Sequence, residues 1–139
     1  MSDFERIRYT AGMLLTADEF RTEQTYHVER RRLLNRMLHG AGVVSGLEVT
    51  GGPEDGTVTV APGFALDRCG REILICEPQQ VTVPAADAEI SVYAVYAEVE
   101  TERSTIRETY TLDASPTPAD DAVVLATIAS DGKITPPRP

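Results

Sequence analysis

Apolar and polar residues follow two different patterns along the chain, and the change comes at about Gly40. Before it, residues 16–39 (TADEFRTEQTYHVERRRLLNRMLH) carry apolar side chains at helical spacings. After it, short apolar runs and alternating valines are separated by clusters of Gly, Pro, Asp and Ser, which is typical of strands and turns. The pattern predicts an α+β fold, with a long N-terminal α-helix followed by a mostly antiparallel β-sandwich or small barrel.

The start of the helix carries a complete capping signal. The hydroxyl of Thr16 can accept a hydrogen bond from the first turn, and Glu19 can return one in a capping box. Leu15 can pack on Phe20 as a hydrophobic staple. We therefore expect the helix to begin at Ala17.

The end of the helix is marked by His39 and by the glycines that follow it. His39 stands where a cation suits the negative end of the helix dipole, and we expect its side chain to cap the last carbonyls. Gly40 can adopt the left-handed conformation that closes a helix, so the predicted helix is Ala17–His39. Gly42 and Gly46 follow a helix instead of preceding one, so we interpret them as close backbone contacts at a structural junction and not as a phosphate-binding loop.

Apolar side chains are unevenly distributed along this helix. Two sets of positions repeat every seven residues: Phe20, His27 and Leu34, and Gln24, Arg31 and Leu38. The apolar stripe is concentrated in the second half, so we expect that half to pack on the chain's own domain and the rest to face solvent or a partner. The alternative is a helix lying flat on its own sheet, with arginine stems covering apolar surface. The candidate partner-binding residues are Phe20, Tyr26, His27, Arg30, Arg31, Leu34 and Leu38.

The remainder of the chain predicts a series of short strands. Residues 43–49 and 57–60 are expected to form a β-hairpin around a Gly- and Pro-rich turn. The longest strand, 90–100, has an apolar half on each face and is expected to be central. The other predicted strands are 64–67, 71–76, 80–83, 106–112 and 123–129, with a tight turn into Ile134.

We expect one structural domain with four parts. These are an extended N-terminal arm (1–15), the helix and its glycine stop (16–42), a β-domain (43–135) and a Pro-rich tail (136–139). Proline has no backbone donor, so the tail cannot continue a sheet interior.

Charge divides along the same line as the hydrophobic pattern. Residues 1–42 carry seven arginines against six acidic residues, a net +1, whereas residues 43–139 carry six basic against sixteen acidic residues, a net −10. An acidic β-domain argues against a nucleic-acid surface, which needs a continuous basic face. The chain has neither a membrane-length apolar run nor a signal-like start, so we expect a cytoplasmic protein with no membrane insertion.

Candidate catalytic groups are few and scattered. His27 and His39 belong to no recognisable motif, and Cys69 and Cys76 have no metal-ligand spacing and are expected to be free thiols. We therefore predict no catalytic residues, no metal and no cofactor. Two alternatives stay open: an enzyme using His39, Asp67, Cys69 or Glu72, and a glycan- or ligand-binding β-sandwich that stacks its ligand on Tyr93, Tyr96 and Tyr110.

Several segments together resemble a known group of proteins. The helix ending LNRMLHG, residues 34–40, leads into GVVSGLEV, residues 42–49, then VTVAPGFALDRCGREI, residues 58–73, and late in the chain LATIASDGKI, residues 125–134. This succession resembles attachment or baseplate-associated, tail-fibre-like structural proteins of contractile phage tails and contractile injection systems. The resemblance covers most of the chain. Ala41 departs from it, because a bulky aromatic residue is expected at that position.

The resemblance implies a structural, non-enzymatic role. Such a protein would be part of a phage-tail-like particle assembled in the cytoplasm, with baseplate, spike or fibre proteins as partners, and would form a homo-oligomer, with a trimer favoured. A chain that ends at Pro139 has no fibre shaft or receptor-binding tip, so an adaptor is expected.

Overall fold

The computed structural model describes residues 3–52 and 55–138. Its one helix, α1 (Ala17–Leu38), precedes all of its strands. The strands are β1 (Gly42–Gly46), β2 (Val49–Thr50), β3 (Thr57–Val60), β4 (Gly63–Leu66), β5 (Glu72–Ile75), β6 (Gln79–Thr82), β7 (Ile90–Glu100), β8 (Ile106–Ser115), β9 (Val123–Ile128) and β10 (Ile134–Thr135). This arrangement confirms the predicted α+β class.

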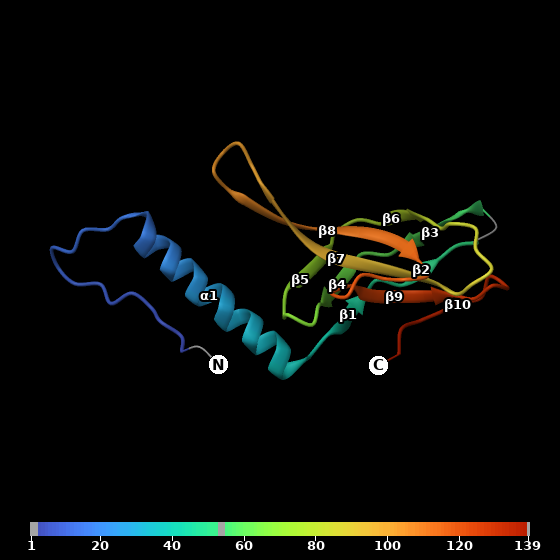
Figure 1. Ribbon diagram of the computed structural model, residues 1–139, viewed down its shortest axis with the longest axis horizontal. Helices are drawn as coiled ribbons and strands as arrows, with labels where there is room; N and C mark the ends of the chain where they lie inside the picture. Colours follow the sequence, from blue (N-terminus) through green and yellow to red (C-terminus); the bar gives the residue numbers. More distant parts are fainter. Residues whose placement is uncertain (1–2, 53–54, 139) are drawn as a thin grey trace.

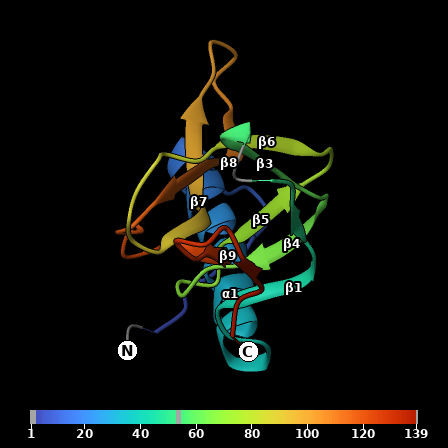
Figure 2. The same ribbon diagram turned by 90° about the vertical axis from the view of Figure 1, so that its right-hand side faces the viewer.

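The strands form three antiparallel sheets with the orders β1-β4-β5, β2-β3-β6 and β10-β9-β7-β8. The chain passes from the second sheet to the first across the short link between β3 and β4 (Figure 2). The three sheets do not close into one sandwich or barrel, so only the α+β class of the predicted architecture is confirmed. Strand β7 lies between β8 and β9, which confirms that the longest strand is central.

One hydrophobic core is shared by all three sheets. It draws on alternate positions of several strands, because successive side chains of a strand point to opposite faces. On β7 the buried face carries Ile90, Val92, Ala94 and Tyr96. The other members are Leu47, Val58, Val60, Ala65, Ile73, Ile75, Val81, Ala114, Val123, Leu125 and Ile128. Every buried member therefore comes from the β-domain.

The predicted first strand, 43–49, is divided in the structure. Leu47 has a φ of 62° and breaks the run. Strand β1 pairs with β4, and only β2 pairs with β3 across the Gly- and Pro-rich turn. The predicted hairpin is therefore correct only for Val49, since the paired strand continues to Thr50, beyond the predicted end, and the residues before Val49 do not pair with β3. The close approach expected at Gly46 is confirmed, since a Cβ there would overlap the carbonyl oxygen of Pro62.

The helix projects away from the β-domain, with the arm running back beside it (Figure 1). No residue of α1 is buried. The second half does rest on the β-domain, as predicted, but through Asn35 and Arg36 and not through its apolar stripe. Leu34 is 56% exposed and Leu38 is 79% exposed. The alternative, a helix lying flat on its own sheet, is wrong, because the helix projects from the β-domain (Figure 1). Among the described residues, no helix is long and apolar enough to cross a membrane.

The ends of α1 agree closely with the predicted signals. The capping box between Thr16 and Glu19 is complete, and Gly40 has a φ of 80°. The helix ends one residue before the predicted position, because His39 is its C-cap. The ring of His39 contributes little to the cap: its Nδ1 lies 2.8 Å from the carbonyl oxygen of Gly40, outside the helix.

Candidate functional site

The helix meets the β-domain at one tight turn, residues 67–71, between β4 and β5. Asp67 is 1% exposed and organises this turn. Its Oδ1 accepts hydrogen bonds from the backbone N–H groups of Cys69 and Arg71, each at 2.9 Å. The Arg71 guanidinium donates to Oδ2 at 2.6 Å and to Asp121 at 3.0 Å. Asp67 is therefore the structural centre of the turn on which α1 rests.

Gly70 allows the helix backbone to touch this turn directly. A Cβ at Gly70 would overlap the carbonyl oxygen of Arg32, and its φ is 81°. The side-chain amide of Asn35 donates to the carbonyl oxygen of Gly70 at 2.9 Å, and the Arg36 guanidinium donates to that of Cys69 at 2.9 Å. The base of the helix is thus held through backbone carbonyls of a turn that has no room for a larger residue than glycine.

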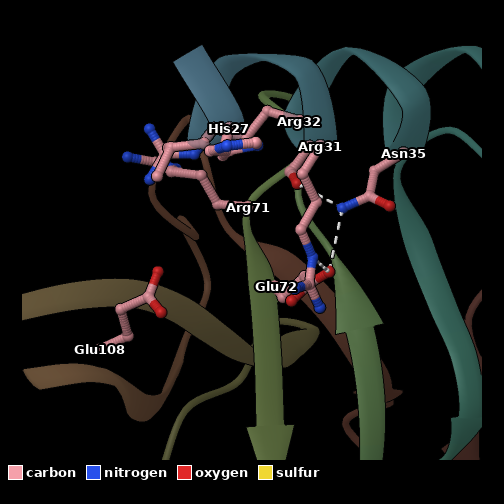
Figure 3. Close-up of a pocket in the computed structure, with 9 residues that line it drawn as sticks. His27, Arg31, Arg32, Asn35, Arg71, Glu72 and Glu108 are labelled. Atoms are coloured by element: carbon pink, nitrogen blue, oxygen red, sulfur yellow. Dashed lines mark hydrogen bonds and ion pairs between the residues drawn. The ribbon is translucent and has the colours of Figure 1, made fainter. Parts of the chain in front are cut away.

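Ion pairs surround this contact (Figure 3). Arg31 Nε donates to Glu72 at 2.7 Å, and Glu72 also accepts from the Asn35 amide at 3.2 Å. On the other side Arg32 reaches Glu98 at 3.5 Å. Between helix and turn lies a small cavity of about 180 Å³, whose lining includes His27, Arg31, Arg32, Asn35, Glu72 and Glu108. These contacts between α1 and the β-domain are therefore all hydrogen bonds or ion pairs.

Tyr96 packs against two arginines of the same contact. The guanidinium carbons of Arg32 and Arg71 lie 5.8 Å and 5.1 Å from the centre of its ring, within the range of cation–π attraction. Its hydroxyl lies 2.7 Å from Glu108 and 2.9 Å from Glu98 and donates its one hydrogen to either carboxylate. Desolvation and these two carboxylates raise the pKa of Tyr96, so the phenol stays neutral over the physiological range.

The N-terminal arm covers another face of the helix. The Arg30 guanidinium carbon lies 5.1 Å from the centre of the Phe4 ring, and the Tyr9 hydroxyl donates to Glu23 at 2.9 Å. The hydrogen bond to Glu23 raises the pKa of Tyr9. At the far end of the molecule, where arm and helix join, Met13, Leu14 and Leu15 are exposed, and Leu14 is 80% exposed. Arm and helix thus form one unit with an apolar tip.

The structure divides the predicted partner-binding residues between different surroundings. Phe20, Leu34 and Leu38 are exposed on α1, whereas His27 and Arg31, which are also exposed, line the pocket between α1 and the β-domain. The other two, Tyr26 and Arg30, lie toward the arm. Tyr26 is half-buried and meets the ring of His27 edge-on, with the ring centres 5.2 Å apart. Whether these residues bind a partner stays a prediction.

The groups considered for an enzyme are not assembled into a catalytic arrangement. Asp67 bonds to Arg71 within its own turn, whereas Glu72 bonds to Arg31 of α1, so the two carboxylates do not act together. Cys69 and Cys76 are free and exposed. Across residues 3–52 and 55–138, no three His, Cys, Asp or Glu side chains come together as metal ligands.

The aromatic platform considered for glycan binding is not present on the surface. Tyr93 and Tyr96 are both buried, and Tyr110 is half-buried against the core. Stacking a sugar needs an exposed ring face, so this trio cannot provide the platform.

Sequence reasoning missed the residues that fix the helix to the β-domain. These are Asn35, Gly70 and Glu98, together with Tyr96 in a supporting role. The signal for Gly70 was present, since a glycine in a tight turn often permits a close backbone approach. Nothing in the spacing indicates that the approaching backbone is that of Arg32, because the two residues are far apart in the chain.

Comparisons with known proteins add no relative. No protein-family model matches the chain, and no match emerges among curated proteins.

Proposed function

We propose that the chain is a non-enzymatic structural adaptor of a phage-tail-like contractile particle, which docks on a baseplate, spike or fibre neighbour through its N-terminal arm and helix. The resemblance of residues 34–49, 58–73 and 125–134 motivates the choice of particle and favours a homo-oligomer, with a trimer first. The observation that carries the docking role is the helix itself: α1 has 22 residues, and none of them is buried.

Helices in proteins gain most of their stability by packing an amphipathic face on other elements. On α1, Phe20, Leu34 and Leu38 are more than half exposed. Leu34 and Leu38 are one helical turn apart, so they form neighbouring exposed apolar side chains of the kind found at interaction sites. A partner that covers this face supplies the packing that the β-domain does not.

The tip formed by the arm and the helix start is the second part of the docking surface. Met13, Leu14 and Leu15 are exposed and come directly before the start of α1, which is the end of the helix farther from the β-domain (Figure 1). The helix starts at Ala17, directly after these residues, and its first turn is capped by Thr16 and Glu19. A tip held at the end of a helix about 33 Å long can reach into a neighbour while the acidic β-domain stays outside.

The test uses purified contractile particles from cells that produce a tagged chain. Mass spectrometry of the particles should find the chain in fixed proportion to the sheath and baseplate proteins. Leu14→Asp should reduce its incorporation at least tenfold, because burying a charge against an apolar pocket is unfavourable.

Leu74→Asp is the matched control. Leu74 is a similarly exposed leucine, 59% accessible, but it lies on β5 of the β-domain. That variant should enter particles normally. Absence of the wild-type chain from particles, or equal incorporation of Leu14→Asp, would sink the proposal.

A further inference from the structure

The hairpin formed by β7 and β8 extends beyond the other strands of its sheet (Figure 1). Strand β9 pairs with β7 only as far as Ala94, whereas β7 and β8 stay paired as far as Glu100 and Ile106. We call this two-stranded part, residues 95–100 and 106–111, the ribbon. Two strands without a third are at best marginally stable in water. The ribbon therefore has a strand edge, that of β7, at which a third strand would be stabilising.

Backbone groups along this edge of β7 have no neighbouring strand. In an antiparallel pair, residues that bond to each other alternate with residues whose N–H and C=O groups point away from the partner. The N–H of Thr101 donates to the carbonyl oxygen of Thr105 at 2.8 Å, directly beyond the ribbon. Counted back from that bonded pair, the backbone groups of Tyr96, Glu98 and Glu100 point away from β8. Within the described residues these groups form no hydrogen bond to another backbone group.

The side chains along the same edge alternate between acidic and apolar. Glu98 and Glu100 are exposed on one face of the ribbon. Ala97 and Val99 lie on the opposite face, because successive side chains of a strand point to opposite sides, and Val99 is 49% exposed. A strand added at this edge would therefore have carboxylates beside one of its faces and small apolar side chains beside the other.

We propose that this edge of β7 binds an extended strand of another protein, in which basic and apolar residues alternate. Strand addition gives main-chain hydrogen bonds to the backbone groups of Glu98 and Glu100, and the alternate side chains of the added strand determine specificity. Its lysine or arginine side chains lie beside the two glutamates, and its apolar side chains lie beside Val99. Side chains of opposite charge on adjoining strands stabilise the pairing.

The surroundings of Glu98 favour a cation at this place. Glu98 is directly opposite Glu108 in the ribbon, and like charges in that position destabilise a strand pair. The Tyr96 hydroxyl lies near both carboxylates and has one hydrogen to donate, and the Arg32 guanidinium is 3.5 Å from Glu98. A basic side chain of an added strand reduces the repulsion that these contacts leave.

The same charges disfavour pairing of this edge with its counterpart in a second copy. Two β7 edges brought together would place Glu98 and Glu100 of one copy beside those of the other. Charged side chains commonly protect exposed edges from such pairing. A strand of opposite charge is not repelled in this way. The outer edge of β8 lacks this selectivity, since Arg107 and Glu108 have opposite charges.

Titration of the purified chain with synthetic peptides tests the strand addition. The probe is a short peptide with blocked ends that alternates lysine with valine, and the reference peptide has glutamate in place of lysine. The amide NMR signals of residues 97–100 should move with the lysine peptide and keep their positions with the glutamate peptide. No movement with the lysine peptide, or larger movement at residues 106–110 than at 97–100, would overturn the proposal.

Charge variants test the specificity of the edge. The double variant Glu98→Gln and Glu100→Gln should bind the lysine peptide about fivefold more weakly, because it loses two pairs of opposite charge. Asp87→Asn with Glu89→Gln is the matched control: both residues are exposed and precede β7, and the change in net charge is the same. That control should bind as the wild type does. Equal weakening in the two double variants would show that the peptide responds only to net charge.

Methylation of the peptide backbone separates strand addition from attraction between charges alone. Only the N–H groups of alternate residues in the added strand face β7. N-methylation of one alternate set should therefore weaken binding about tenfold or more, and methylation of the other set should leave it nearly unchanged. Unchanged binding of both methylated peptides would refute the pairing with β7.

The outcome is separable from that of the docking role, because the ribbon is a different surface from α1 and the arm. A chain that enters particles in a Leu14-dependent manner but does not bind the lysine peptide refutes strand addition and leaves the adaptor role intact. A chain that binds the peptide but is absent from particles does the reverse.

Discussion

The β-domain and α1 are held in place by different kinds of contact. In the β-domain, apolar side chains from three sheets are buried together, and the only buried charged residue among those described is Asp67, which is paired with Arg71. In α1 no side chain is buried, and its base is fixed by hydrogen bonds and ion pairs. Hydrophobic burial is the dominant stabilising term in folding, whereas exposed ion pairs contribute little. The β-domain is thus stabilised by its own core, whereas α1 contributes no buried residue to that core.

The largest difference in stability is expected between two leucine-to-alanine substitutions, one in the core and one on the helix. Leu125 is 2% exposed in the core, and Leu38 is 79% exposed on the helix. Leu125→Ala should lower the free energy of unfolding by about 2–5 kcal/mol, because it removes buried methyl groups and leaves a cavity. Leu38→Ala should change it by less than about 0.5 kcal/mol in the dilute single chain. Urea unfolding at low protein concentration measures both. Equal losses would show that α1 belongs to the core after all.

An intermediate effect is expected where the two regions touch. Gly70→Ala places a Cβ against the Arg32 carbonyl, in a backbone conformation that costs other residues about 1–2 kcal/mol. The helix must therefore move away from the turn. The amide resonances of Asn35 in NMR spectra should shift or broaden, while those of β7 and β9 should keep their positions.

Gly132→Ala is a suitable control for this substitution. Gly132 also has a positive φ, 88°, but it lies in the turn before β10, away from α1. It should cost similar backbone strain without disturbing Asn35. If both variants moved the Asn35 signals equally, the close contact at Gly70 would not be what positions the helix.

The smallest effect concerns the helix cap and pH. Hydrogen bonds from the Thr16 hydroxyl and backbone N–H lower the pKa of Glu19 below its ordinary value of about 4.3. A carboxylate with a lowered pKa stabilises the folded state above its unfolded pKa, and this contribution is lost as the pH falls through the folded value. The first turn of α1 should therefore loosen only in acid. An NMR titration of Glu19 should show the lowered pKa, and Thr16→Ala should raise it toward the ordinary value. An unchanged pKa in that variant would contradict the capping box.

Local features of this fold could be predicted from the sequence, and long-range ones could not. The helix start at Ala17, the closing glycine at Gly40 and the long central strand 90–100 depend on neighbouring residues, and all three are confirmed. The partner of β1 could not be predicted, because the positive φ of Leu47 redirects a run of residues that otherwise continues as one strand. Strand pairing depends on contacts between distant segments.

The candidate site shows the same division. The seven-residue repeat of Phe20, His27 and Leu34 was visible in the sequence, and so was the arginine cluster. The sequence did not show which face of α1 points toward the β-domain, because an apolar stripe gives no indication of whether it packs on its own domain or on another chain. The polar contact of Asn35 with Gly70 decides this, since it turns the stripe toward solvent.

Hydrogen exchange of the purified chain tests the central claim most directly. The claim is that the β-domain is stabilised by its own core, whereas α1, which has no buried residue, is not. The amides of β7 and β9 should therefore be strongly protected in the purified chain, and those of α1 should exchange much faster. Protection of α1 that is equal to that of β7 would contradict the account.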